Sequence, residues 1–419
     1  MVGVPQTGAP ADIGATLVGY AAGIYQYTIP IVSDAAARAL AQNSPMAYHL
    51  LPSEDYLEST MGDSAHPVIR FSGAGYAKEK AAYGSTIANR VALDDFLVAS
   101  SLNPALIAYA NSQHAALDYW TPPAGIEVDQ IAGWGVDTVA GIDFYTPPPV
   151  SIASILDPVR AYRPIFTEDG DGTVTVPSAI MMASSTDVKR YWADLDSYYK
   201  ATKIRRSHKD LFEIPSLQDF IKYIIGNNTS ILPSYIVSSQ PAPLVNNKEL
   251  TFFLHSPLTL QLRDSLGNVT GLATDDSVTQ NIPGSTYGEF GEVKYVTVPG
   301  GRAYQLTMHG QASGTFSLDT QETSGGVVTT SSTIAGVPTT ASTIVSMDIP
   351  PDISTPSPMT IDKNGDGTID AVITPKLGST VIFDTTPPEL QIMFSTTTKS
   401  IAFIGTDDSG TVTMTSTTD

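Results

Sequence analysis

Two short segments carry the residue types that acid–base catalysis needs. The first is Glu168-Asp-Gly-Asp-Gly-Thr-Val174, an acidic turn rich in glycine, and the second contains His208. A carboxylate on a tight turn lies close to backbone groups that fix its rotamer, and histidine is the side chain best able to move a proton near neutral pH. Asp171 is therefore a candidate acid and His208 a candidate general base. The alternatives are an acidic surface turn or a metal loop for the first segment, and a solvated loop histidine for the second.

A third segment has the pattern of a calcium loop. Asp362-Lys-Asn-Gly-Asp-Gly-Thr-Ile-Asp370 places oxygen ligands at alternate positions, with glycine at the sixth and a carboxylate at the ninth. The twelfth position is Ile373 in place of glutamate, and the flanking residues are typical of strands, so the loop is no complete EF-hand. The alternative is an acidic hairpin without metal, and no organic cofactor is expected. We expect a structural Ca²⁺ with the ligands Asp362, Asn364, Asp366, Thr368 and Asp370.

A nucleophile to accompany His208 is missing from the chain. The sequence contains no Gly-x-Ser-x-Gly motif, and its nearest relative, Gly62-Asp-Ser-Ala-His66, lacks both the last glycine and a preceding apolar strand. No His-Gly-Gly-Gly type oxyanion loop occurs either. The absence of cysteine excludes a cysteine nucleophile, a zinc-thiolate site and a disulfide framework.

The elements around the acid–base candidates predict an α/β part over residues 1–230. Ile126-Glu-Val-Asp-Gln-Ile131 alternates as a strand does, and Asn103-Pro104 opens a helix with proline at its first position. Ser33 and Ser216 are candidate helix caps, and Gly226 is a candidate helix stop. We expect helices over 34–41, 104–117 and 216–226, and strands over 126–131 and 198–204, with His208 on a loop after the last strand.

The rest of the chain predicts an all-β part. Threonine, valine, glycine and proline dominate from about residue 240, in short alternating runs bounded by turn signals. We expect a β-sandwich over 235–380 that contains the calcium-type loop. Within it, the run 293–298 is expected to turn at Pro299-Gly-Gly and to form a hairpin with 304–308. Residues 385–419 begin with a proline pair and predict a partial β repeat or extension. Its strands are expected over 390–394, 401–404 and 412–414.

Several motifs together resemble a known family. Val2-Gly-Val-Pro-Gln-Thr-Gly-Ala-Pro10, Ser44-Pro-Met-Ala-Tyr48 with Leu51-Pro-Ser53, the acidic turn at 168–174 and His208 occur in this order. This set is similar to the lecithin:cholesterol acyltransferase-like branch of the α/β-hydrolases, which includes lysosomal-type phospholipases. The resemblance covers 1–228 and corresponds to the C-terminal half of the family domain.

The resemblance implies a partial α/β-hydrolase fold with a helical cap over about 25–125. It implies that Asp171 is the triad acid and His208 the base. The family serine lies on an elbow upstream of the strand that ends in the Pro-x-x-Gly loop, so the resemblance implies a truncated domain without its serine and oxyanion hole. Because triad members act as a unit, this chain alone is expected to be inactive.

The function that follows is a secreted serine esterase, phospholipase or acyltransferase acting on lipid or other acyl esters. The β region is then expected to bind a cell surface or a polysaccharide, and the protein to be extracellular or at the cell surface. The alternative is a non-catalytic, calcium-stabilised cell-surface or adhesion protein with a hydrolase remnant. Met1 is followed by Val-Gly-Val-Pro without a basic segment, so no signal peptide is expected within this chain.

Charge and hydropathy exclude two kinds of partner. Lysine and arginine number 22 against 42 acidic residues, a formal net charge of −20, and phosphate binding needs clustered cations. We therefore expect no nucleic-acid partner. No run of 18 apolar residues occurs, so no transmembrane segment is expected.

Overall fold

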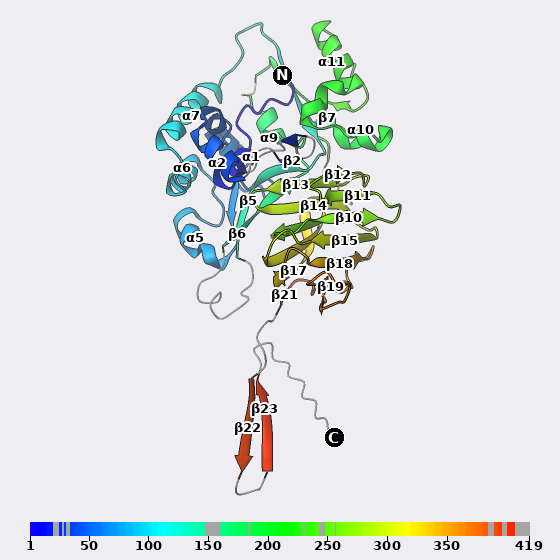
Figure 1. Ribbon diagram of the computed structural model, residues 1–419. Helices are drawn as coiled ribbons and strands as arrows, with labels where there is room; N and C mark the ends of the chain where they lie inside the picture. Colours follow the sequence, from blue (N-terminus) through cyan, green and yellow to red (C-terminus); the bar gives the residue numbers. More distant parts are fainter. Residues whose placement is uncertain are drawn as a thin grey trace.

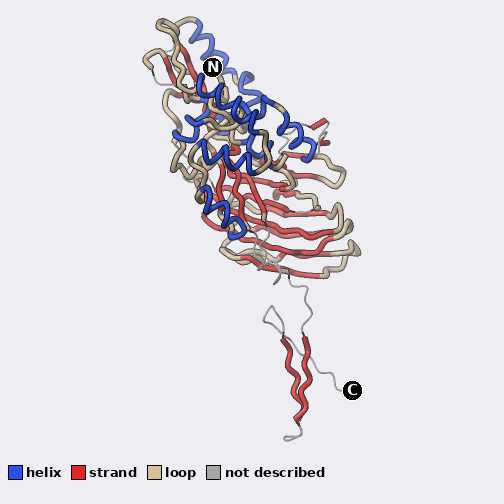
Figure 2. The backbone as a smooth tube through the Cα atoms, turned by 90° about the vertical axis from the view of Figure 1, so that its left-hand side faces the viewer, coloured by secondary structure: helices blue, strands red, loops and turns tan. Residues whose placement is uncertain are grey.

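A computed structural model describes most of the chain. The described residues are 1–19, 25–26, 29–30, 34–146, 160–182, 185–228, 231–242, 248–255, 257–383, 389–395 and 400–406. They form a mixed α/β part with small sheets in the N-terminal half and a large all-β, sandwich-like part in the C-terminal half. Helices gather at one end of the molecule and the long strands at the other (Figures 1 and 2). The prediction of an α/β part followed by an all-β part is confirmed at this level.

The N-terminal half contains short helices and short strands. Its helices are α1 (Ala11–Leu17), α2 (Asp34–Asn43), α3 (Pro45–His49), α4 (Glu54–Ser59), α5 (Ala77–Tyr83), α6 (Arg90–Ala99), α7 (Pro104–Leu117), α9 (Val176–Ala179), α10 (Leu195–Thr202) and α11 (Pro215–Ile225), with 3₁₀ turns η1 (Ala74–Tyr76) and η2 (His208–Glu213). Its strands are β1 (Tyr25–Gln26), β2 (Ile29–Pro30), β3 (Ile69–Phe71), β4 (Val128–Trp134), β5 (Thr138–Tyr145), β6 (Ala161–Thr167), β7 (Val188–Asp194) and β8 (Ile236–Val237).

Two three-stranded sheets organise this half. In the first, β4 runs parallel to β7 in register from Val128 opposite Val188, and β8 adds antiparallel to β7. Val2 extends this sheet through a parallel bridge to Ile131 on β4. In the second sheet, β5 pairs parallel with β3 and antiparallel with β6.

The helix over 104–117 is confirmed, and its start has the predicted cause. Asn103 accepts a hydrogen bond from the backbone N–H of Ala105, at 2.9 Å, and Pro104 occupies the first helical position. The proline needs no hydrogen-bond donor there, because the first N–H groups of a helix have no partner within the helix.

Two local predictions are wrong. The segment 198–204 is not a strand, because most of it belongs to helix α10, which Asp194 caps by accepting from the N–H of Ser197 at 2.9 Å. Its buried residues, Leu195 and Tyr198, are three positions apart, which is the spacing of one face of a helix and not of a strand. Ser216 is not the cap of α11, since the helix starts one residue earlier, at Pro215. Ser33 lies outside the described residues.

The C-terminal half consists of two facing sheets. Its strands are β9 (Lys248–His255), β10 (Gln261–Asp264), β11 (Val269–Leu272), β12 (Val278–Gln280), β13 (Thr286–Phe290), β14 (Val293–Pro299), β15 (Tyr304–His309), β16 (Gly314–Ser324), β17 (Val327–Thr339), β18 (Ile344–Ile349), β19 (Met359–Asp362), β20 (Ala371–Ile373) and β21 (Thr380–Ile382). One sheet has the order β12-β11-β10-β15-β18-β19-β20 and the other β13-β14-β9-β16-β17-β21. Side chains from both sheets form one apolar core.

The predicted hairpin across Pro299-Gly-Gly is wrong. Strand β14 pairs with β9 and β13, whereas β15 belongs to the other sheet and pairs with β10 and β18. The Pro299-Gly-Gly turn therefore carries the chain from one sheet to the other. Both runs alternate, and alternation identifies a strand without identifying its partner.

A second apolar core joins the two halves. Phe253 and Tyr295 of the sandwich pack in one cluster with Ile13, Val139 and Ile142 of the N-terminal half. Neighbouring residues on a strand point to opposite faces, so Phe252 enters the core between the two sheets while Phe253 faces the helical half. The β9 sheet is thus covered on both faces.

The last described segment is a hairpin of β22 (Glu389–Ser395) and β23 (Ser400–Thr406), which pair only with each other among the described residues. The hairpin is set apart from the other strands in both views (Figures 1 and 2). The strand expected over 412–414 lies outside the described residues. Within the described ranges, every helix is too short or too polar to span a bilayer.

Candidate acid–base site

Asp171 and His208 lie side by side and are joined by a hydrogen bond. The Nδ1 atom of His208 is 2.9 Å from Oδ2 of Asp171. The backbone N–H of His208 also donates to the carbonyl oxygen of Asp171, at 2.8 Å. The Asp171 side chain is 1% exposed and that of His208 is 35% exposed. The pair therefore consists of a buried carboxylate and an imidazole that still has access to solvent.

The acid loop, defined here as residues 168–172, fixes the Asp171 carboxylate. Its Oδ1 atom accepts hydrogen bonds from the backbone N–H groups of Thr173 and Val174, at 3.1 and 2.8 Å. Gly172 follows with a φ of 93°, and its N–H donates to the hydroxyl of Thr138 at 2.8 Å. The positive φ explains the glycine, because residues with a Cβ rarely adopt it. One carboxylate oxygen is thus occupied by the backbone and the other faces His208.

Two glycines leave room for the pair. A Cβ atom on Gly133, in β4, would lie 2.5 Å from Cβ of Asp171. A Cβ atom on Gly3, whose φ is 59°, would lie 3.2 Å from Oδ2 of Asp171 and 3.3 Å from Nδ1 of His208. At Gly3, near the start of the chain, and at Gly133, near the carboxyl end of β4, the chain therefore approaches the site with backbone alone.

The position of the pair follows from the parallel sheet. Val136, just after β4, forms a parallel bridge with Asp171, while His208 follows β7 and helix α10. The bridge places Asp171, which follows β6 along the chain, beside the carboxyl end of β4, and His208 comes after the parallel strand β7. The pair therefore lies at the edge of the sheet where open α/β sheets place their ligand sites. His208 itself begins the 3₁₀ turn η2, whose cap residue Ser207 accepts from the backbone at Asp210.

The electrostatics of the pair suit a general base. The hydrogen bond to Asp171 raises the pKa of His208 above its ordinary value, and this effect outweighs burial. A proton on Nδ1 that is donated to Asp171 leaves Nε2 as the atom that accepts a proton from a nucleophile. The arrangement can therefore take up one proton and return it, with the carboxylate stabilising the imidazolium in between.

A second histidine–aspartate contact borders the acid loop and was missed by the sequence reasoning. His66 is 4% exposed, with Nδ1 2.8 Å from Oδ2 of Asp63 and Nε2 3.4 Å from Oδ2 of Asp169. The local signal is the spacing of Asp63 and His66, three residues apart in Gly62-Asp-Ser-Ala-His66. Its partner Asp169 is distant along the chain, so no local spacing predicts the contact.

The predicted calcium ligands share one loop between β19 and β20. Asp362 is buried, and its two carboxylate oxygens accept from the backbone N–H groups of Gly365 and Gly367, at 2.7 and 2.8 Å. Asp370 accepts from the N–H of Lys363 at 2.6 Å. The remaining contacts bring the side chains of Asn364 and Asp366 together and place the N–H of Thr368 on Asp366.

These contacts order the calcium-type loop through its own backbone. Across the part of the chain that the structure describes, no group of three or more acidic or histidine side chains is arranged to hold a metal ion. The strands predicted on either side of the loop, β19 and β20, are confirmed. Calcium binding stays a prediction.

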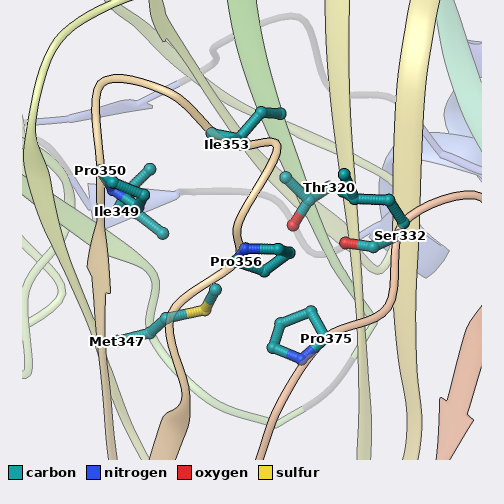
Figure 3. A pocket seen from close by; sticks show the side chains of 9 residues that line it. Thr320, Ser332, Met347, Ile349, Pro350, Ile353, Pro356 and Pro375 are labelled. Atoms are coloured by element: carbon teal, nitrogen blue, oxygen red, sulfur yellow. The ribbon is translucent and has the colours of Figure 1, made fainter.

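The hollows described on the molecule lie in the sandwich and not at the acid–base pair. A small cavity of about 20 Å³ has room for about one water molecule. Figure 3 shows the side chains around it, which are Thr320, Ser332, Met347, Ile349, Pro350, Ile353, Pro356, Pro375 and Leu377. A second hollow of about 360 Å³ is more open and is bordered by Arg263, Asp264, Tyr304 and Asp348 among others. Neither borders Asp171 or His208.

Comparison with known proteins adds no family: no protein-family model and no curated protein matches this chain.

Proposed function

We propose that this chain carries the acid and the base of a Ser-Asp-His acyl ester hydrolase or acyltransferase of the α/β-hydrolase type. The observation that carries the proposal is the 2.9 Å hydrogen bond between buried Asp171 and half-buried His208. In such a triad the acid orients the imidazole and stabilises its charged form, while the second ring nitrogen handles the proton. A solvated surface histidine would need neither a buried carboxylate nor backbone donors behind that carboxylate.

The chain order supports the same proposal. Residue Val2, strand β4 and strand β7 run parallel; the acid lies beside the end of β4 through the bridge of Val136 with Asp171, and the histidine follows β7 and helix α10. Acid before histidine is the order of the α/β-hydrolase triad. The resemblance to the lecithin:cholesterol acyltransferase-like branch rests on the same residues, and in this proposal the helices from α2 to α7 are its cap.

The proposed reaction needs a serine from outside these 419 residues. His208 Nε2 takes the serine proton as the hydroxyl attacks the acyl carbonyl, and returns it to the leaving alcohol. A water molecule or a second alcohol then releases the acyl group by the same proton transfer. Without the serine and its oxyanion donors, the pair alone is proposed to be inactive.

The β-sandwich is proposed to serve outside the cell. In this proposal it binds a cell surface or a polysaccharide, and a structural Ca²⁺ sits in the loop 362–370. The four acid or amide side chains on this short loop support the proposed Ca²⁺ site. Extracellular calcium is concentrated enough to fill a weak site of this kind.

The test of the proposed function is the coding sequence upstream of Met1. An in-frame Gly-x-Ser-x-Gly preceded by an oxyanion loop supports the esterase. An in-frame stop codon directly upstream contradicts it, and then favours the alternative of a calcium-stabilised surface protein that retains a hydrolase remnant.

A further inference from the structure

The buried histidine next to the acid loop has two negatively charged neighbours. Its Nδ1 atom faces Asp63, which is 47% exposed, and its Nε2 atom faces Asp169, which is 16% exposed. The contact to Asp63 is a well-formed hydrogen bond at 2.8 Å, whereas 3.4 Å to Asp169 is an ion-pair distance. The other titratable group close to both carboxylates is Tyr56, whose hydroxyl bonds to Thr175 and whose pKa is raised by burial.

A neutral imidazole does not suit this environment. It has one N–H donor, so one of its nitrogens would turn a lone pair towards a carboxylate. The protonated ring has two donors and a positive charge, and both match the two aspartates. Burial lowers the pKa of His66, but the interactions with Asp169 and Asp63 outweigh burial and raise it overall.

The second aspartate belongs to the acid loop. Asp169 precedes Asp171 by two residues, and its carbonyl oxygen accepts from the N–H of Val176 at 2.8 Å. Its other carboxylate oxygen, Oδ1, accepts from the side chain of Gln240 at 2.7 Å. Asp169 is thus held between the segment at 63–66 and the segment after β8, and the position of Asp171 depends on the same turn.

We propose that His66 is a positioning residue. As an imidazolium between Asp63 and Asp169, it holds the acid loop in place, so that Asp171 keeps its hydrogen bond to His208. The inference rests on the proposed function, because it assigns His66 a task in keeping the acid–base pair aligned. His66 touches neither Asp171 nor His208 in this arrangement and acts through Asp169.

The test follows the imidazole resonances of the ¹⁵N-histidine-labelled protein by NMR as a function of pH. In the wild type, His66 should carry protons on both nitrogens and lose one only above the ordinary histidine pKa of about 6.5. In His66→Gln, the Nδ1–H signal of His208 should broaden and its titration midpoint should fall, because a loosened Asp171 raises the pKa of His208 less. Asp169→Asn, which keeps the shape and removes the charge, should do the same if His66→Gln folds poorly.

The matched control is His114→Gln. His114 is also buried, lies 3.2 Å from Asp118 and bonds to the carbonyl of His49 at 2.8 Å, yet none of these partners belongs to the acid loop. This variant should leave the titration of His208 unchanged while lowering stability. A neutral His66 at pH 6.5, an unchanged His208 in both test variants, or an equal shift in the control would each overturn the proposal.

These readouts do not depend on turnover. A stop codon directly upstream of Met1 would remove the proposed function and leave the behaviour of His66 to be measured in the same way. Conversely, a neutral His66 would remove the positioning role while Asp171 and His208 still titrate as a pair.

Discussion

Of the two glycines that leave room for the acid–base pair, Gly133 is the more tightly packed. Gly133 lies on β4 with Asp171 against its face, and an added methyl group would meet Cβ of Asp171 at 2.5 Å and a side-chain carbon of Leu195 at 3.2 Å. Real Cβ atoms do not approach other carbons as closely as the first distance. The absence of a side chain at this position is therefore a condition for the buried carboxylate.

Replacing this glycine should destabilise the protein. Gly133→Ala is expected to lower the free energy of unfolding by about 1–3 kcal/mol, because overpacking forces neighbouring atoms to shift. The matched control is Gly314→Ala on β16, whose added Cβ would lie 3.4 Å from Pro257, an ordinary contact. Urea unfolding measures both, and equal small effects for the two variants would show that Asp171 is not packed against β4.

The hydrogen bond between Asp171 and His208 predicts a pH dependence of stability. It raises the pKa of His208 in the folded protein, so the stabilisation is complete below the unfolded value near 6.5 and is lost as the pH rises through the folded value. Asp171→Asn should therefore cost more stability at pH 5.5 than at pH 9. Unfolding at both pH values measures this, and a difference that grows with pH would contradict the pairing.

Elements of the two halves meet at a buried polar contact. The hydroxyl of Tyr145, at the end of β5, donates to Oδ2 of Asp319 on β16 and lies 2.7 Å from Nε2 of His255 on β9. Arg163 of β6 stacks on the Tyr145 ring, 4.4 Å from its centre, and pairs with Asp319 at 3.6 Å. Burial raises the pKa of Asp319, but contacts with His255 and Arg163 outweigh it and lower the pKa overall.

Removing that hydroxyl should cost more than removing one whose hydrogen bond lies within the sandwich. Tyr145→Phe removes one of the donors to the buried Asp319 carboxylate and is expected to cost about 1–3 kcal/mol. Tyr304→Phe removes a hydroxyl that donates to the carbonyl of Pro299 within the sandwich, and should cost about 1 kcal/mol or less. Thermal unfolding of both variants gives the comparison, and a larger loss for Tyr304→Phe would mean that the β5–β16 contact does not stabilise the protein.

Some helices and strands could be predicted from the sequence and others could not. Local signals predicted helix α7 from Asn103 and Pro104, and they predicted β19 and β20 around the acidic loop. They did not predict helix α10, since a strand was expected over 198–204, or the separation of β14 and β15 into different sheets. The Asp171–His208 contact was anticipated through chain order, whereas the contact of His66 with Asp169 depends on long-range packing that no local pattern records.

At the scale of the whole molecule, two of the apolar cores share strand β9. Phe252 enters the core between the sandwich sheets, and Phe253 enters the core that includes Ile13 and Val139 of the helical half. Both side chains are almost fully buried. Because one strand belongs to both cores, a substitution that destabilises either core should also destabilise the other half.

This arrangement predicts a single unfolding transition. All three tryptophans, Trp120, Trp134 and Trp192, belong to the N-terminal half, so their fluorescence reports that half alone. Phe252→Ala and Phe253→Ala are each expected to cost about 3–5 kcal/mol and to lower the fluorescence midpoint together with the circular dichroism midpoint. If Phe252→Ala lowers only the circular dichroism midpoint, the two halves unfold independently.

We propose that Asp171 and His208 perform acyl ester chemistry with a serine supplied from outside these residues. The most direct measurement is hydrolysis of p-nitrophenyl acyl esters by the protein extended to include the coding sequence upstream of Met1. We expect measurable hydrolysis, a loss of about 10⁴-fold or more in kcat for His208→Ala, a large loss for Asp171→Asn, and full activity for His309→Ala on the sandwich. Hydrolysis that survives unchanged in His208→Ala would show that His208 is not the base.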